Sequence, residues 1–438
     1  MNRIRNALAV VCVLFIESAV FGVEFGPGAA KSVRQEPSEV KSDAQRSAWV
    51  DIYSGPALDL VIPVFDPGIP GDPARWEAQG IWPELRRAEA VWYSKKMAEA
   101  LERTGIFNSV LVVPDNAVSS DLYLLGELVE SNGEDLEIEL NLFATTGEQL
   151  IKKKKLKARV SPAWYTDPRT QDNDPFQAAY GSMANLIVSE LMKVAKKDEK
   201  LREKNKKYLA KNQFKKIKTE ALEEIRIVRQ ALYGQALSGD EFASVTKRKK
   251  GLVTLAFIPD TSQENWRRVG SIISADAKFN QLMNSSYNDL TETMNDSYRL
   301  WQKDAYPIAK AQREAREAAN AALVGALLGA AVAGSLAKNS NSTAGQVAAA
   351  TAAVASVGAL AKSFKEREES KQQASQLNEL GNSVSSVMSP KVISMENREV
   401  ELTGTASEQQ AQWSTLLKEM YDEGLQDFGD LEIISSNS

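Results

Sequence analysis

Two uncharged, alanine-rich runs occupy residues 318–337 and 339–361 of this sequence, and the only charge between them is Lys338. Each run is long enough for a helix of about 30 Å, because an α-helix rises about 1.5 Å per residue. Small residues recur at every fourth position in each run, where they would form a smooth strip that lets two helices approach closely. These residues are Ala321, Gly325, Gly329 and Ala333 in the first run and Gly345, Ala349 and Ala353 in the second. We therefore predict a tightly packed helical hairpin over residues 318–361.

The composition of this hairpin is compatible with two environments. Small-residue packing is typical of membrane helices, where van der Waals contact drives association. Alanine is also the best helix former in water, and the two runs contain fewer large apolar side chains than a spanning helix of about 20 residues usually has. Membrane association through residues 318–361 and an alanine-packed hairpin in a soluble domain or oligomer are therefore alternative predictions. We also expect the protein to form a homo-oligomer.

Residues 1–22 have the three parts of a secretion signal. Arg3 and Arg5 form a positive region, residues 7–16 form an apolar core, and residues 20–22 provide a cleavage site. The mature chain is expected to begin near Val23. Cys12 lies early in the apolar core and follows a valine, where a lipid-attachment site requires a small residue, and this position argues against lipidation.

The residue types that are missing exclude several classes of enzyme. The sequence has no histidine, and its single cysteine lies within the predicted signal. Ser-His-Asp catalysis, Cys-His catalysis and ordinary zinc sites are therefore excluded for the mature chain, because each needs an imidazole or a thiolate. Carboxylate, serine-lysine and lysine chemistry stay open. The net charge of −5, which becomes −6 without Arg3, Arg5 and Glu17, does not indicate nucleic-acid binding.

An α/β domain is predicted over residues 56–196, after a flexible leader at residues 23–55 that is rich in glycine, proline and serine. Pro83 suits the first turn of a helix, and Gly105 provides its stop. Residues 136–142 alternate between apolar and polar side chains, which is the pattern of a sheet with one buried face. The expected strands are residues 58–65, 110–113, 122–128, 136–142 and 149–160, and the expected helices begin at Pro83 and at Gln177, the second ending near residue 194. The fold class is therefore α+β, with an N-terminal α/β sandwich domain that contains a mixed sheet.

Four consecutive lysines, residues 152–155, lie in the last expected strand. Lysines of this kind protect a solvated edge strand against aggregation, and we predict that role for them. The alternative is a patch that binds phosphate or anionic lipid.

Four segments of this domain follow one another in a recognisable order. They are residues 61–65 (VIPVF), 100–107 (ALERTGIF), 120–126 (SDLYLLG) and 140–148 (LNLFATTGE). This order resembles the envelope domains of the TolB N-terminal and curli-channel type, over about a third of the chain. None of the motifs is catalytic. The resemblance implies a module that binds partners during assembly at the periplasm or the outer membrane.

The rest of the chain is predicted to be mainly helical. Residues 197–317 form a charged helical region with a stripe of large apolar side chains, which we predict to be core rather than a platform for a sugar or cofactor. The stripe consists of Tyr287, Leu290, Met294, Tyr298 and Trp301. After the helical hairpin, residues 362–438 are expected to form a charged helix, a short β-hairpin and a C-terminal helix capped by Ser407, followed by an acidic tail.

Six residues after the first strand and at the start of the first helix form the candidate partner-binding site. They are Asp66, Trp82, Glu84, Arg86, Arg87 and Glu89. They lie in segments that resemble a motif recurring in secreted bacterial proteins. Paired carboxylates can hydrolyse glycosidic bonds, which makes a cell-wall hydrolase using Asp66 or Glu84 an alternative. Glu84 and Glu89 do not stack on one helix face, however, and we predict that the arginines and carboxylates form a charge cluster that fixes the loop at residues 66–68.

Together these features predict a secreted, non-enzymatic envelope protein of a Gram-negative bacterium. We expect it in the periplasm or on the periplasmic side of the outer membrane, with other envelope proteins as partners and with no cofactor. No metal site is predicted either, because the loop with Asp167, Asp172 and Asp174 lacks the spacing and the closing glutamate of a calcium loop.

Overall fold

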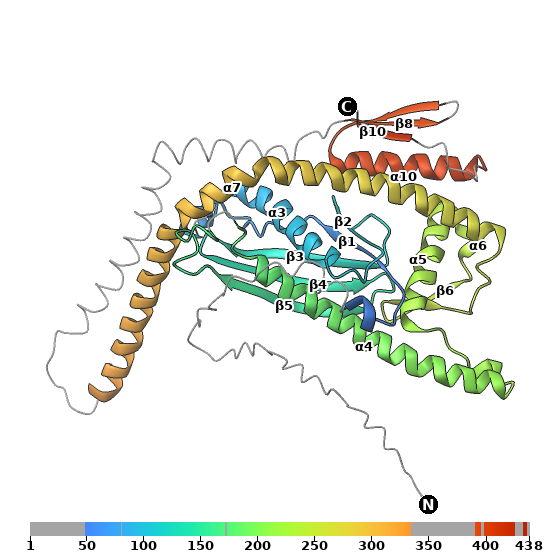
Figure 1. Cartoon of the computed structure of the whole chain (residues 1–438), viewed down its shortest axis with the longest axis horizontal. Coiled ribbons are helices and arrows are strands. Elements are labelled where there is room, and N and C mark those ends of the chain that lie inside the picture. The colour runs from blue at the N-terminus through green and yellow to red at the C-terminus, as the bar shows by residue number, and fades with distance from the viewer. Residues whose placement is uncertain are drawn as a thin grey trace, which may run out of the picture.

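A computed structural model describes residues 49–79, 81–170, 173–333, 390–395, 398–424 and 432–435 of the chain. These residues form the α+β fold that the sequence predicts, a five-stranded mixed sheet followed by a helical region (Figure 1). The predicted signal, the turn of the helical hairpin and the charged helix after it lie outside the described residues. So do Gly345, Ala349 and Ala353.

The sheet has the strand order β2-β1-β3-β4-β5. Its strands are β1 (Asp59–Pro63), β2 (Ser109–Val113), β3 (Leu122–Ser131), β4 (Asp135–Ala144) and β5 (Gln149–Arg159). β1 is parallel to β2 and to β3, whereas β3, β4 and β5 form an antiparallel meander. Every second residue of β4 is buried, as the alternation in its sequence predicts.

The four lysines at residues 152–155 are exposed on β5, which is an edge strand of the sheet. This placement confirms the prediction of a solvated edge strand. The neighbouring strand β4 supplies counter-charges, because Glu137 contacts the ammonium groups of Lys155 at 2.7 Å and of Lys157 at 2.5 Å.

Two long helices, α3 (Pro83–Glu102) and α4 (Gln177–Ala210), contact each other and the sheet. Pro83 occupies the start of α3, as expected, and a short helix, α2 (Ala74–Gln79), precedes it. α4 continues well past residue 194, the predicted end, to Ala210, and a 3-10 turn, η1 (Phe214–Lys216), follows it.

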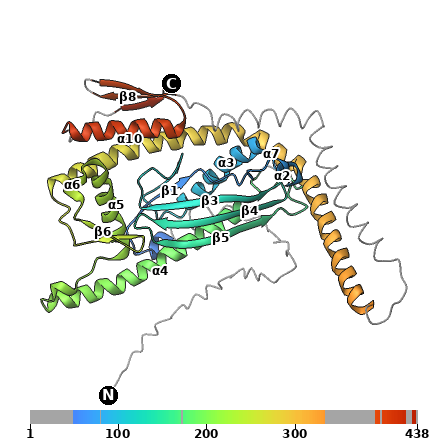
Figure 2. The ribbon, with the colours of Figure 1, turned by 180° about the vertical axis from the view of Figure 1, so that it is seen from behind.

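The helical region contains α5 (Ala221–Leu237), α6 (Gly239–Phe242) and α7 (Glu264–Ala333). A hairpin of β6 (Thr246–Lys249) and β7 (Leu252–Leu255) lies beside α5, as the view from behind shows (Figure 2). This region does not have a core of its own. A single hydrophobic cluster runs from Leu58 to Tyr421, so the boundary predicted at residue 196 does not separate two independently packed units.

The predicted leader also ends earlier than residue 55. Trp49 packs against the hydrophobic core, and its indole N–H donates to the Oδ1 atom of Asn185 at 3.1 Å. Tyr53 packs there too and donates its hydroxyl to the carbonyl of Pro56. Two large aromatic side chains therefore order the last residues of a segment whose overall composition predicts a flexible chain.

α7 is a single helix of 70 residues. At about 1.5 Å per residue the length along its axis is about 105 Å, and this axis bends before the projecting end (Figure 1). Along the body it covers β2, and the Oδ1 atom of Asn284 accepts a hydrogen bond at 2.9 Å from the amide of Val112 on that edge strand. The helix then continues without interruption past residue 317, so that its orange end projects from the body (Figure 1). Ala321, Gly325, Gly329 and Ala333 all belong to this projecting part.

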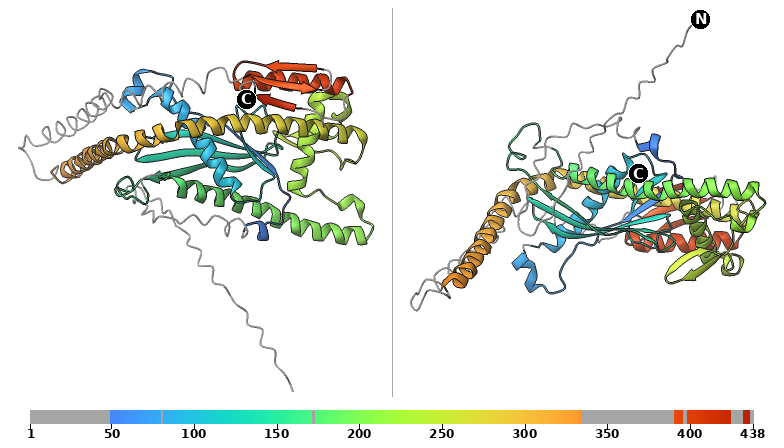
Figure 3. Two further views of the ribbon diagram at one scale, coloured as in Figure 1. Left: turned by 45° about the horizontal axis from the view of Figure 1, so that its top comes forward. Right: turned by 90° about the horizontal axis from the view of Figure 1, so that it is seen from below.

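A small C-terminal layer covers the side of α7 that faces away from the sheet (Figures 1 and 3). It contains β8 (Lys391–Met395), β9 (Arg398–Leu402), α10 (Ala406–Asp422) and β10 (Glu432–Ser435), with the strand order β10-β8-β9. The β-hairpin and the helix confirm the sequence prediction. The N-cap is Thr405 rather than Ser407, because Thr405 and Glu408 form a reciprocal capping box. Within the tail, residues 432–435 form a strand paired with β8, which the acidic composition did not predict.

Candidate functional site

The six candidate partner-binding residues lie near the start of α3 and after β1, but they do not form one surface. Trp82 is the N-cap of α3, and four of the others belong to the first turns of this helix. Asp66 is exposed, and the half-buried residues are Trp82, Glu84 and Arg87. Arg86 is 5% exposed and Glu89 is 0% exposed. Arg86 and Glu89 are therefore closed to a docking partner in this structure, whereas the other four are accessible.

Backbone pairing fixes the loop that follows β1. The amide of Asp66 donates to the carbonyl of Gly126, and the carbonyl of Asp66 accepts from the amide of Leu128, both at 2.8 Å. The carboxylate of Asp66 accepts from the amide of Gly68 within the same turn. Gly68 has a φ of +61°, and a Cβ atom there would overlap the carbonyl oxygen of Leu128. The predicted charge cluster is therefore not what holds this loop, since backbone atoms and a glycine do so.

Glu89 belongs to a buried ring of oxygen atoms where α3, β3 and α7 meet. Its Oε1 atom accepts hydrogen bonds from the hydroxyl of Ser131 at 2.6 Å and from the hydroxyl of Tyr298 at 2.8 Å. The hydroxyl of Tyr93 lies 2.9 Å from that of Ser131 and 2.7 Å from that of Tyr298, which closes the ring. All four side chains are buried.

Glu89 is the acceptor at the centre of this ring. Its Oε1 atom accepts from two hydroxyl groups, and its Oε2 atom lies 3.7 Å from the Nε atom of Arg86. Burial raises the pKa of Glu89, and the guanidinium of Arg86 and the two hydroxyl donors oppose this effect only in part. Glu89 is therefore a buried carboxyl group that two hydroxyl donors and one guanidinium stabilise against the cost of burial.

The ring ties three elements together and is not an accessible catalytic pair. Each of its bonds joins side chains on α3, β3 or α7, and its carboxyl group has no exposed surface. The sequence indicates Glu89 as a site residue and Tyr298 as core, but it does not bring Tyr93 and Ser131 to attention. The spacing of the aromatic residues is the signal that could have pointed to this ring. It predicts that Tyr298 is buried, and a buried tyrosine hydroxyl normally requires a hydrogen-bond partner.

A recess of about 410 Å³ lies between α3 and α7. Its lining residues are Trp92, Lys95, Lys96, Glu99, Asn288, Thr291, Glu292 and Asn295. Lys95 is only 6% exposed, and it forms neither a hydrogen bond nor an ion pair within 4.0 Å to any residue that the structure describes. The nearby carboxylate of Glu102 interacts with Lys95 through space, which offsets part of the solvation that a buried ammonium loses.

Trp92 forms the floor of this recess, between two cations. The ammonium of Lys96 and the guanidinium of Arg299 lie 4.9 Å and 5.1 Å from its ring centre. The indole N–H of Trp92 and the side-chain oxygen of Asn288 are buried and find no hydrogen-bond partner in the described parts of the chain. A small polar molecule bound in the recess is one way to satisfy these groups.

A second buried charge cluster joins α5 to the start of β1. The Nη1 atom of Arg229 lies 2.5 Å from Asp59 and 3.7 Å from Asp121, and its Nη2 atom donates to the carbonyl of Ser119. Burial acts to raise the pKa of Asp59, but Arg229 and neighbouring hydrogen-bond donors outweigh it and hold this pKa below its usual value. The cluster was not visible in the sequence, because Arg229 and Asp59 are 170 residues apart.

The described ranges contain no group of three or more acidic side chains that could hold a metal ion. Asp167 instead pairs with Arg169, and Asp174 with Arg299. None of the helices in those ranges has both the length and the apolar character that a membrane span requires.

No family model, curated protein or solved structure matches this chain. The resemblance to TolB-type envelope domains stays a prediction.

Proposed function

We propose that this chain is a non-enzymatic cell-envelope protein that binds partners or supports assembly at the periplasm or the outer membrane. In this proposal the α/β domain docks an envelope protein through Asp66, Trp82, Glu84 and Arg87. The small-residue segment at residues 318–361 makes the protein oligomerise or associate with a membrane. The observation that supports this arrangement best is the continuity of α7, which joins the core of the body to the small-residue segment in one helix.

The part of α7 within the body is firmly anchored. Phe279, Met283, Met294 and Tyr298 are all 0% exposed. Farther along, the guanidinium of Arg313 donates to the buried carboxylate of Glu134 at 3.0 to 3.2 Å, close to the point where the helix leaves the body. The projecting end of α7 is therefore held by a helix that is packed into the core of the body. This arrangement suits a segment that contacts other molecules.

The test replaces Gly325 and Gly329 together with leucine. Leucine has a higher helix propensity than glycine, so a loss of function cannot be attributed to a weaker helix. The matched control replaces Ala326 and Ala330 with leucine, since helical periodicity places these positions on another side of the same helix. Membrane fractionation with a carbonate wash, together with light scattering of the purified protein, should show loss of retention or of assembly for the glycine pair only. Unchanged behaviour of the glycine pair would refute the role of the segment.

The same experiments address the hydrolase alternative. Glu84→Gln should leave cell-wall turnover unchanged if the chain is a binding protein, and should abolish it if Glu84 is a general acid or base. Glu84 is half-buried, and no ion pair or hydrogen bond joins it to Asp66 among the described residues. A loss of turnover with normal assembly would favour the hydrolase.

A further inference from the structure

The end of α4 and the chain that follows it form a strongly basic projection, which we call the basic finger (residues 200–218). Figure 1 shows it extending from the body at the opposite end from the projecting part of α7. The finger contains nine lysines and arginines and a single acidic residue, Glu203. Its net charge is therefore +8, within a chain whose total is −5.

Most of these cations have no counter-charge. Within the described residues, the ion pairs of the finger are those of Arg202 with Glu220 at 2.6 Å and of Lys206 with Glu203 at 2.8 Å. The remaining lysines are all exposed and form no ion pair within 4.0 Å in this part of the chain. They are Lys200, Lys204, Lys207, Lys211, Lys215, Lys216 and Lys218.

The tip of the finger also exposes two large apolar side chains. Leu209 is 56% exposed and Phe214 is 61% exposed, on either side of the turn that ends α4. These side chains are not exposed by fraying, because the returning chain is tied back to the helix. The side chain of Asn205 bonds both the amide and the carbonyl of Lys218, and Asp198 accepts from the first amides of α5.

The lysines of β5 provide a contrast inside the same molecule. Lys153, Lys155 and Lys157 lie near carboxylates of β4, and no large exposed apolar side chain accompanies them. Solvation of an edge strand explains that group. It does not explain a finger in which seven of nine cations form no ion pair among the described residues and which exposes a leucine and a phenylalanine.

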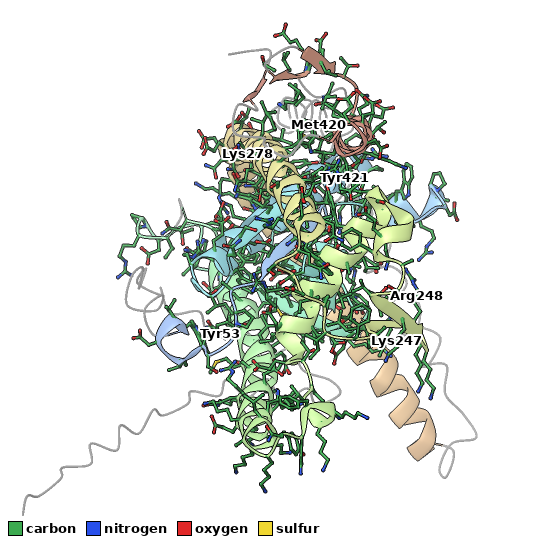
Figure 4. All side chains as sticks on the ribbon, turned by 90° about the vertical axis from the view of Figure 1, so that its right-hand side faces the viewer. Tyr53, Lys247, Arg248, Lys278, Met420 and Tyr421 are labelled. Carbon is green, nitrogen blue, oxygen red and sulfur yellow. The ribbon has the colours of Figure 1, made fainter. Side chains whose placement is uncertain are left out.

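A second basic and apolar element lies at the same end of the molecule. The hairpin of β6 and β7 exposes Lys247, Arg248, Lys249 and Lys250, and Leu252 at its turn is 40% exposed. Figure 4 looks onto this end of the molecule, and Lys247 and Arg248 of the hairpin are labelled there.

We propose that the basic finger docks on a lipid bilayer that carries anionic head groups. Lysines near such a surface are attracted by its negative potential, while apolar side chains at the tip enter the boundary between head groups and acyl chains. A nucleic acid would satisfy the lysines but would leave Leu209 without an apolar environment, so the bilayer fits both observations. This inference concerns a different part of the chain from residues 318–361 and does not depend on the proposed function.

The test is sedimentation of the purified chain with phosphatidylcholine vesicles that contain or lack phosphatidylglycerol. Binding should require phosphatidylglycerol and should fall when salt is raised from about 0.1 M to about 1 M, because the Debye length shrinks. Lys211→Gln with Lys215→Gln should weaken binding about 30-fold, since each cation near an anionic surface contributes about fivefold. Leu209→Ser with Phe214→Ser should weaken it about tenfold at unchanged charge.

The control variant is Lys152→Gln with Lys154→Gln on β5, which makes the same change in net charge and should bind as the unmodified chain does. Equal binding to both kinds of vesicle, or equal weakening by the β5 and finger variants, would overturn the proposal. So would salt-sensitive binding of a DNA duplex that exceeds vesicle binding and ignores the Leu209 and Phe214 changes. Salt-resistant binding that the Gly325→Leu and Gly329→Leu changes abolish would also overturn it, and would assign the membrane contact to α7.

Discussion

Replacing Asp276 with asparagine should remove a pH-dependent loss of stability. Asp276 lies on α7 beneath α10, where it is 4% exposed and accepts a hydrogen bond from the indole of Trp413 at 3.1 Å. Gln410 and Asn280 bond the same carboxyl group, and Arg229 is the nearby cation. Burial dominates these interactions and raises the pKa of Asp276 from 3.8 to about 6.

The direction of the effect follows from proton linkage. Between pH 3.8 and about pH 6 the folded protein holds a proton on Asp276 that the unfolded chain has released, so the free energy of unfolding falls as pH rises. The free energy of unfolding falls by about 1.4 kcal/mol for each pH unit in this interval. The total fall is about 3 kcal/mol and is complete above the pKa of Asp276 in the folded protein. Asparagine is neutral at every pH and can accept from Trp413 in the same way. The variant should therefore match the unmodified protein near pH 4 and exceed it by up to about 3 kcal/mol near pH 7.

Urea unfolding of both proteins across this pH range measures the difference directly, and taking the difference cancels the other titrating groups. Asp296→Asn, which makes the same chemical change at an exposed position of the same helix, provides the control. If the difference for Asp276→Asn is the same at pH 4 and at pH 7, then burial does not raise this pKa and the reasoning is refuted.

Three further substitutions test the contacts around the site. Arg229→Met should lower the free energy of unfolding by about 3 kcal/mol, because it removes the closest cation from the buried Asp121 and the half-buried Asp59; a loss below about 1 kcal/mol in urea unfolding would contradict this. Tyr298→Phe should cost about 1–3 kcal/mol, since it removes a donor to Glu89 and leaves its partners short of a bond; an unchanged urea midpoint would show that the ring does not contribute to stability. Gly68→Ala should lower the thermal midpoint, because its φ of +61° and the nearby carbonyl of Leu128 both oppose a Cβ atom; a midpoint equal to that of the unmodified chain would show that the loop can move.

Local patterns were sufficient to predict most elements of the sheet. The alternation over residues 136–142 requires one buried face, and β4 has that face. Pro83 marks the start of α3, and the spacing of Tyr287, Met294 and Tyr298 predicts the side of α7 that is buried. These features depend on neighbours in the chain, so a sequence is enough to find them.

Features that depend on distant partners could not be predicted in this way. Arg86 and Glu89 look like surface charges at the start of a helix, but both are buried in the folded chain, where Glu89 contacts β3 and α7. Residues 432–435 are too short to indicate a strand until β8 provides a partner. The change from charged residues to alanine near residue 318 suggests a domain boundary. Charged residues and alanine are both good helix formers, however, and α7 is continuous across residue 318.

Arg313 ties α7 to the body six residues after Pro307, the proline inside this helix. Its guanidinium bonds Glu134, whose side chain is 2% exposed, and also Glu317 one turn along the helix at 3.0 Å. The bonds to Glu134 raise the pKa of Arg313, so this cation stays charged at every pH that the fold tolerates. Arg313→Met should cost about 3 kcal/mol, because it leaves a buried carboxylate unpaired.

The loss should be local as well as global. Glu134 belongs to the turn between β3 and β4, where Gly133 packs against the backbone of Gln302 on α7. Without Arg313, the amides of this turn should exchange hydrogen faster, whereas those of β4 should change less. Arg313→Lys keeps the charge but loses the bidentate geometry. Its amide exchange rates in this turn should lie between those of the unmodified chain and those of the Met variant. Unchanged exchange in the Met variant would mean that packing around Gly133, and not the ion pair, holds this turn against α7.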